Sequence, residues 1–196
     1  MNPARRRSRP LMVDTTGIVA GATFVASPNC DHRPDGTLIT LVVIHGISLP
    51  PGEFGGGAIA CLFTNQLDPS AHPYFAGIAS RRVSAHFLIH RDGALVQFVP
   101  CTLRAWHAGE SSWRGQVRCN DFSIGIELEG TDEIPYAEPQ YRVLARLMRA
   151  LQYRYPIESI AGHSDIAPGR KTDPGPAFDW AHLARLDRGA RHHKMV

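Results

Sequence analysis

One run, Leu38–Ile44, constrains the fold of this chain more than any other stretch. It is rich in β-branched residues and has almost no alternation of polar and apolar positions. That pattern is typical of a strand buried on both faces, as at the centre of an α/β sheet. The run ends at His45-Gly46. A histidine at the end of a central strand is a common place for a ligand or catalytic group, although a single one is more often structural.

Further segments predict the rest of the sheet and its helices. Residues 84–90 and 94–99 are strand-like and flank an Asp-Gly turn, so we predict a β-hairpin. Residues 122–129 alternate strictly and predict a strand. Residues 138–155 carry an apolar stripe at helical spacing, and Pro156 ends that helix. With shorter helices at 58–66 and 179–186, the order predicts an α/β fold: a single domain with a central mixed β-sheet flanked by helices.

Chain length and periodicity predict the domain boundaries. The 196 residues suffice for one domain with a substantial core. We predict an N-terminal arm at 1–30 that is partly disordered, a folded domain at 31–186 and a polar C-terminal tail at 187–196. Periodic signal is weak up to residue 37, so this whole stretch is expected to be irregular. The arginine-rich run at 5–9 permits nucleic-acid binding, but a solvated tail is the interpretation we favour because no aromatic residue accompanies it.

Composition and hydropathy exclude several classes of protein. The chain is 43% hydrophobic with a net charge of +3, as in ordinary globular proteins. No apolar run approaches the roughly 20 residues that span a bilayer, and the apolar Leu11-Met12-Val13 stops at Asp14, too early for a signal peptide. We therefore expect a cytoplasmic location, with no nucleic-acid or membrane partner. The four cysteines form no Cys-x-x-Cys pair and are expected to be small buried hydrophobes.

A loop at residues 162–176 combines ionisable side chains with several glycines and prolines. Glycine permits unusual backbone angles and proline fixes φ, so the loop can be rigid without regular structure. Lys171 and Asp173 are two residues apart, which places both side chains on one side of an extended segment. Asp173 can then ligate a cation while Lys171 stabilises a developing negative charge. The alternative is an ordinary surface turn with solvated charges.

Three other groups of polar or aromatic residues have two interpretations each. Glu127 and Glu129 lie on the small-residue side of the 122–129 strand, either at the surface or beside a ligand for which Gly125 leaves room. Trp106 can stack on a ligand or close the core. His86 and His90 are some 13 Å apart on a strand, too far to share a metal, and are structural or line the site.

His45, His163 and Asp173 each follow or lie just beyond a strand-like run, so the fold can bring them to one edge of a sheet. Two imidazoles and a carboxylate suit catalytic zinc, which keeps a fourth position for water. Glu127 can transfer the proton of that water to a leaving amine, and Lys171 can stabilise the oxyanion. Together these roles describe amide hydrolysis. Spacing alone is weak evidence, because ten histidines allow many such triplets.

Long motifs make the chain similar to a known family between about Asp31 and Trp180. They are His45 with Ile47–Gly56, Arg82–His86, Arg104–Gly109, Cys119–Gly130 and the loop at 162–176. On these motifs the chain resembles the cytoplasmic AmpD family of N-acetylmuramoyl-L-alanine amidases, within the zinc amidase and peptidoglycan-recognition superfamily. The implied substrate is a small muropeptide, a 1,6-anhydro-N-acetylmuramyl peptide imported as a cell-wall fragment. The implied reaction cuts the bond between its lactyl group and L-alanine, and no obligate protein partner is implied.

The resemblance also implies roles for individual residues. Zn²⁺ would be bound by His45, His163 and Asp173, with Glu127 the catalytic glutamate and Lys171 the lysine that supports the transition state. This favours Glu127 over Glu129, which alternation left undecided. Substrate-binding positions match these residues: Arg82, Trp106 and Arg118. A surface salt bridge or a core aromatic is the alternative for each of these three. The family usually has asparagine after the first zinc histidine, whereas this chain has Gly46.

Two other functions compete with that interpretation. A peptidoglycan-recognition module would bind without cutting, but superfamily members of that kind have lost a zinc ligand and this chain keeps all three. A secreted or phage-type amidase would act on the intact wall, and the absence of a signal sequence and of paired cysteines counts against it. Recycling amidases of this family also limit β-lactamase induction, by removing the anhydromuropeptides that act as inducers in many Gram-negative bacteria.

Overall fold

The computed structural model describes residues 10–187 and contains a six-stranded sheet in the order β12-β5-β11-β6-β7-β3. β5 (Leu41–Ile47) lies between β12 (Ser159–Gly162) and β11 (Ser123–Glu129) and pairs with both in parallel. β11 also pairs in parallel with β6 (Phe87–Ile89). Four neighbouring parallel strands, β12, β5, β11 and β6, therefore end at one edge of the sheet.

The remaining strands make the sheet mixed. β6 and β7 (Leu95–Gln97) form the predicted antiparallel hairpin, and Gly93 in its turn has a φ of 88°, which glycine adopts readily. β3 (Thr23–Phe24) adds to the far edge, parallel to β7. The predicted fold class, an α/β domain with a central mixed sheet, is confirmed.

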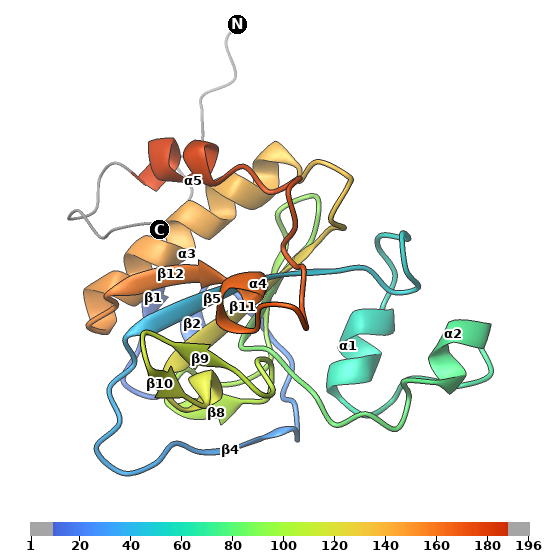
Figure 1. Cartoon of the computed structure of the whole chain (residues 1–196), viewed down its shortest axis with the longest axis horizontal. Helices are drawn as coiled ribbons and strands as arrows, with labels where there is room; N and C mark the ends of the chain where they lie inside the picture. The colour runs from blue at the N-terminus through green and yellow to red at the C-terminus, as the bar shows by residue number, and fades with distance from the viewer. Residues whose placement is uncertain (1–9, 188–196) are drawn as a thin grey trace, which may run out of the picture.

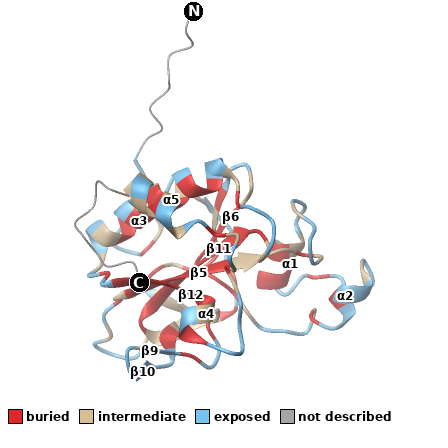
Figure 2. Ribbon diagram, turned by 45° about the horizontal axis from the view of Figure 1, so that its top comes forward, coloured by how far each residue is buried: buried red, intermediate tan, exposed pale blue. Residues whose placement is uncertain are grey.

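Helices cover one face of this sheet (Figure 1). α3 (Glu138–Arg154) and α5 (Trp180–Asp187) lie together on that face. Val42 and Ile44 of β5 share a core cluster with Leu147 and Met148 of α3. Leu41 and Val43 belong to a different cluster on the opposite face. The central strands are therefore buried on both faces, as the colours of Figure 2 show.

Shorter elements lie on the opposite face or beside the sheet. These are α1 (Ala58–Phe63), α2 (Pro73–Ala76), α4 (His163–Ile166) and the 3-10 helix η1 (Cys119–Asp121). Two small ribbons pair β4 (Cys30–His32) with β8 (Leu103–Ala105) and β9 (Ser112–Trp113) with β10 (Gln116–Val117). Loops and short elements, rather than long helices, surround the carboxyl ends of the parallel strands.

The N-terminal region differs from the prediction of an irregular arm. β1 (Met12–Val13) pairs with β2 (Val19–Ala20), and β3 and β4 also fall within residues 1–37. Strands of two or three residues are too short to show periodicity, so the sequence pattern missed them. Residues 1–9 of the predicted arm and residues 188–196 of the predicted tail lie outside the described residues.

Two other boundaries moved. The central strand begins at Leu41 rather than Leu38 and continues through His45 to Ile47, because its pairing with β11 extends to Glu129. The helix predicted at 58–66 ends earlier, because α1 stops at Phe63. Within residues 10–187, no helix is long and apolar enough to cross a membrane.

Candidate active site

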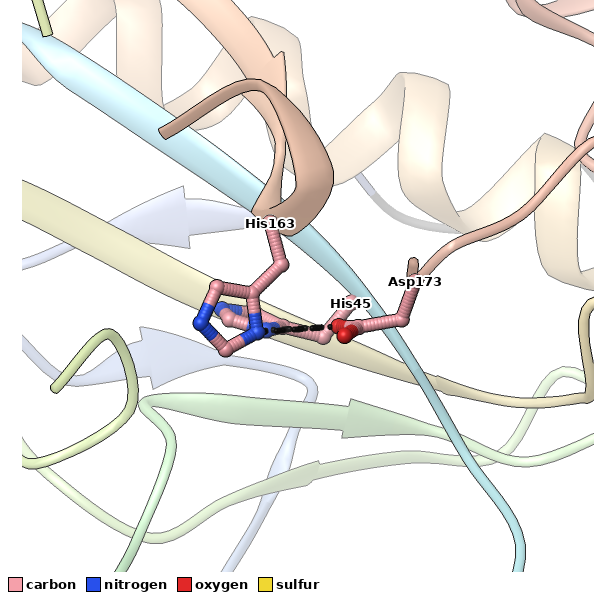
Figure 3. Close-up of side chains that lie close together, drawn as sticks. All are labelled: His45, His163 and Asp173. Atoms are coloured by element: carbon pink, nitrogen blue, oxygen red, sulfur yellow. Dashed lines mark hydrogen bonds and ion pairs between the residues drawn. The ribbon is translucent and has the colours of Figure 1, made fainter. Parts of the chain in front are cut away.

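The two histidines and the aspartate predicted as metal ligands lie together at the carboxyl ends of β5 and β12 (Figure 3). His45 is in β5, His163 is the first residue of α4 after β12, and Asp173 comes from the loop that follows α4. His45 Nδ1 lies 2.9 Å from His163 Nδ1, and each of these nitrogens lies 3.1 Å from Asp173 Oδ2. Three potential ligand atoms thus face one another.

The chemistry of these atoms fits a bound cation. His163 Nε2 lies 3.2 Å from the carbonyl oxygen of Ala108, so Nε2 carries the proton and donates it. In that tautomer, Nδ1 of His163 presents a lone pair to His45 and Asp173. Ligands bonded to one zinc ion at about 2.0–2.1 Å in a tetrahedron lie roughly 3.3 Å apart. The observed separations of 2.9–3.1 Å are close to this value.

The protonation states of the cluster also suit metal binding. Burial lowers the pKa of His45 to about 4, more than the opposing hydrogen bond to Asp173 raises it. Burial by itself raises the pKa of Asp173, but its close contacts with the rings of His163 and His45 outweigh burial and hold that pKa well below its usual value. At neutral pH His45 is therefore neutral and Asp173 ionised, the states in which imidazole and carboxylate bind metals.

Glu127 lies beside the cluster because it is the register partner of His45 on the neighbouring parallel strand. Its side chain is buried, and its Oε2 has no hydrogen-bond partner within residues 10–187. Burial, and then the charge of Asp173, raise its pKa well above the usual value, while Lys171 opposes the shift. A buried carboxylate oxygen without a partner is costly, so the site is suited to a cation, water or substrate that satisfies it.

Glu129, the other glutamate of β11, is also buried but has a different environment. Its carboxylate accepts hydrogen bonds from the backbone N–H groups of Gly55, at 2.9 Å, and Arg91, at 3.1 Å. It also pairs with His90 Nδ1 at 3.1 Å. Glu129 therefore anchors the loop at 48–57, and neither glutamate is at the surface.

The cluster opens into a cleft of about 230 Å³. Its polar residues include Glu127, Lys171 and the three clustered residues. An apolar and aromatic wall faces them, formed by Ile47, Leu49, Leu62, Phe63, Tyr74, Ile78, Val83 and Trp106. A concave site with convergent ionisable groups and one apolar wall is the usual form of a ligand-binding site.

Of the three predicted substrate-binding residues, one lines this cleft. Trp106 does so, whereas Arg82 is exposed and donates to the carbonyl oxygen of Ser80 at 3.2 Å. Arg118 forms an ion pair with Asp121 and lines a neighbouring depression with Glu110 and Arg170. The cleft also contains Arg81, Tyr74 and His107, which the sequence analysis did not single out.

Two glycines at the site make room for protein side chains. A Cβ on Gly125 would lie 2.5 Å from His107 Cγ, so the space expected for a ligand is filled by His107. A Cβ on Gly46 would collide with the hydroxyl of Tyr136, which donates to the carbonyl oxygen of Pro174 at 2.9 Å. Tyr136 thus fixes the backbone immediately after Asp173.

Hydrogen bonds near both ends of the loop at 162–176 hold it in place. Its first residues form α4, a helical turn that the prediction of no regular structure missed. Asp165 Oδ2 accepts from the N–H of Gly162 at 2.7 Å, and the N–H of Ser164 donates to the carbonyl oxygen of Asp173 at 2.9 Å. This second bond joins the two ligand-bearing ends of the loop, and Lys171, on the same loop, lines the cleft with Asp173.

Comparison with known proteins identifies the class to which this fold and site belong. Residues 35–176 match the family described as N-acetylmuramoyl-L-alanine amidase, and the chain belongs to this family. The predicted enzyme class, an N-acetylmuramoyl-L-alanine amidase, is confirmed.

Comparison with individual relatives supports a more specific assignment within this family, to the AmpD amidases. The 1,6-anhydro-N-acetylmuramyl-L-alanine amidase AmpD of Escherichia coli K12 is 61% identical over 172 residues, covering 87% of this chain and 94% of the relative. A crystal structure of selenomethionine AmpD superposes with a TM-score of 0.87 at 59% identity, covering 89% of this chain and 99% of that one. The predicted resemblance to the AmpD family is confirmed.

A more distant solved structure contains a substrate. It is the E. coli amidase AmiD in complex with anhydro-N-acetylmuramic acid-L-Ala-D-γ-Glu-L-Lys, with a TM-score of 0.56 and 30% identity. The match covers 79% of this chain and 60% of AmiD.

Proposed function

We propose that this protein is a zinc-dependent amidase of peptidoglycan recycling. Its substrate would be a 1,6-anhydro-N-acetylmuramyl peptide, cut between the lactyl group and L-alanine. The observation that carries the proposal is the His45–His163–Asp173 cluster, with both histidines buried and the unpartnered carboxylate oxygen of Glu127 beside it. The names of the AmpD relatives and the ligand of AmiD support the choice of substrate.

In this proposal His45, His163 and Asp173 hold Zn²⁺ through Nδ1, Nδ1 and Oδ2. When bound there, zinc polarises the scissile carbonyl and lowers the pKa of a water molecule towards 7. Glu127 accepts a proton from the attacking water at its unpartnered Oε2 and delivers it to the amide nitrogen as the C–N bond breaks. The products are the lactyl carboxylate and the free amine of L-alanine.

Lys171 and the cleft walls take the remaining roles. The Lys171 ammonium stabilises the negative charge that develops on the carbonyl oxygen. Trp106, which lines the cleft, would contact the sugar or the start of the peptide. Arg82 and Arg118 lie outside the cleft and are proposed to bind carboxylates of the stem peptide there. A guanidinium can bind a carboxylate through two parallel hydrogen bonds.

The first test is mass spectrometry of anhydromuramyl tripeptide incubated with the purified protein. We expect free tripeptide to appear, to stop appearing when a zinc chelator is added and to reappear with added zinc. Binding without cleavage would instead support a recognition module, and cleavage insensitive to chelation would exclude the zinc site. Intact sacculi serve as the comparison substrate, because a wall-degrading amidase would prefer them.

The cellular part of the proposal follows from the same substrate. An enzyme that acts on imported anhydromuropeptides has to be located in the cytoplasm, where it would also limit β-lactamase induction. Fractionation of cells that express the protein tests its location. Accumulation of anhydromuropeptides after deletion of its gene tests its role, and unchanged levels would contradict the proposal.

A further inference from the structure

A third histidine, His107, contacts the metal cluster from the side of His45 opposite to Asp173. His45 Nε2 lies 2.9 Å from His107 Nδ1, and the two rings meet edge to face, with centroids 5.0 Å apart and an interplanar angle of 84°. His107 Nε2 lies in turn 3.1 Å from the hydroxyl oxygen of Ser123. A chain of side chains thus runs from the cluster through His45 and His107 to Ser123.

The positions of the protons along this chain follow from the metal site. His45 Nδ1 points at His163 and Asp173, so it must present a lone pair when a cation is bound. A neutral imidazole carries a single N–H, which for His45 is then on Nε2. That N–H donates to Nδ1 of His107, and His107 consequently carries its own proton on Nε2 and donates it to Ser123.

The other tautomer of His107 would have the opposite effect. A proton on its Nδ1 would donate to His45 Nε2 and leave the proton of His45 on Nδ1. That proton would point towards Asp173, in the space that a cation needs. The tautomer of His107 therefore decides whether His45 presents a lone pair or a proton to the site.

The His107 side chain is held in place by its surroundings. Its ring occupies the space left by the missing Cβ of Gly125. The side-chain oxygen of Asn120 accepts hydrogen bonds from the backbone N–H groups of His107, at 3.1 Å, and Ala108, at 2.8 Å. Because the carbonyl oxygen of Ala108 accepts from His163 Nε2, this segment contacts both histidines of the cluster.

We propose that His107 is a positioning residue that holds His45 in its Nε2–H tautomer and so aims Nδ1 of His45 at the metal. This inference rests on the proposed zinc site and deepens it. Partners of this kind fix the ring orientation of metal-bound histidines, and their loss typically costs roughly 10–100-fold in metal affinity or activity.

The test begins with the unmodified protein. Long-range ¹H–¹⁵N NMR of zinc-loaded protein labelled with ¹⁵N-histidine reports which ring nitrogen carries each proton. We expect His45 and His107 both to carry it on Nε2. A proton on Nδ1 of His107 would overturn the proposal without any mutation.

Two substitutions at one position then measure the effect on zinc affinity by competition with a chelator. His107→Leu removes the acceptor and should weaken zinc binding by roughly 10–100-fold. His107→Asn places an amide oxygen near the position of Nδ1 and should stay within about threefold of the unmodified protein, by the same reasoning. His182→Leu is the matched control and should leave affinity unchanged, because His182 pairs with Glu138 and belongs neither to the metal cluster nor to the lining of the cleft.

The outcomes separate this inference from the proposed function. If the unmodified protein takes up no zinc, the proposed metal site is wrong. If it binds zinc and His107→Leu binds it equally well, the metal site stands and the positioning role of His107 is wrong. If His107→Leu does not fold, the histidine tautomers in the unmodified protein and the zinc affinity of His107→Asn still test the positioning role of His107.

Discussion

Replacing Glu127 by glutamine tests the proposed proton transfer most directly. Glutamine has nearly the same shape, so the buried position beside His45 should stay filled. The amide cannot accept the proton of an attacking water at the position of Oε2. General-base catalysis contributes roughly 10²–10⁴-fold to rate, so turnover should fall by that factor, or by about 2.7–5.5 kcal/mol in the barrier.

Zinc content should remain unchanged in this variant, because Glu127 is not one of the three residues whose ligand atoms converge. The assay combines the rate of tripeptide release with metal analysis of the same preparation. A variant that keeps its zinc and still turns over at nearly the normal rate would refute the assignment of Glu127 as the base. Loss of zinc together with activity would show that Glu127 supports the metal instead.

The remaining predictions concern the metal, the transition state and pH. Loss of a residue that only positions a metal ligand costs up to roughly 100-fold in metal affinity. His163→Ala removes a ligand itself and should therefore weaken zinc binding by more than that; unaltered zinc content would show that His163 is not a ligand. Lys171→Ala should lower kcat by roughly 10²–10³ with a smaller change in substrate affinity, and a pure affinity loss would contradict its transition-state role. The hydrogen bond to Glu129 raises the pKa of His90, so this pair stabilises the fold below the unfolded pKa of about 6.5 and loses that contribution as pH rises through the folded value. His90→Gln should therefore lower the free energy of unfolding at about pH 5.5 by about 1 kcal/mol or less, seen as a lower Tm, and leave Tm unchanged at about pH 9; a Tm difference independent of pH would contradict this.

Local pattern was sufficient to predict the elements that carry the site. The apolar run before His45, the alternation around Glu127 and the stripe of the 138–155 helix each reflect burial that is visible within a few residues. β5, β11 and α3 formed accordingly. These segments have long, regular periodicity, which is the most reliable secondary-structure signal in a sequence.

Contacts between distant segments could not be predicted in the same way. Nothing near Glu127 in the sequence indicates that it pairs in register with His45, 82 positions earlier, because strand register depends on the whole sheet. Gly125 was expected to leave space for a ligand, but the ring that fills this space belongs to His107, in the loop between β8 and β9. The role of Tyr136 in fixing Pro174 depends likewise on two loops that meet only in the folded protein.

The face of the sheet that carries the site differs physically from the face under α3. Under α3, β11 contributes Ile124, Ile126 and Leu128 to an apolar core. On the other face the same strand presents Ser123, Gly125 and Glu127, which must be satisfied by hydrogen bonds or left for a ligand.

Hydrogen bonds do satisfy most of that polar face. The guanidinium of half-buried Arg33 donates to the carbonyl oxygens of Cys101, Asn120, Asp121 and Ser123, and loss of hydration lowers its pKa to about 10. His86 accepts from the N–H of Gly125 through Nδ1, so its Nε2–H is free to donate to the carbonyl oxygen of Leu103. Glu127 Oε2 is then the buried side-chain polar atom of β11 that lacks a partner within the described part of the chain. A network that satisfies its neighbours and leaves this buried atom without a partner beside the cleft is what a preorganised proton acceptor requires.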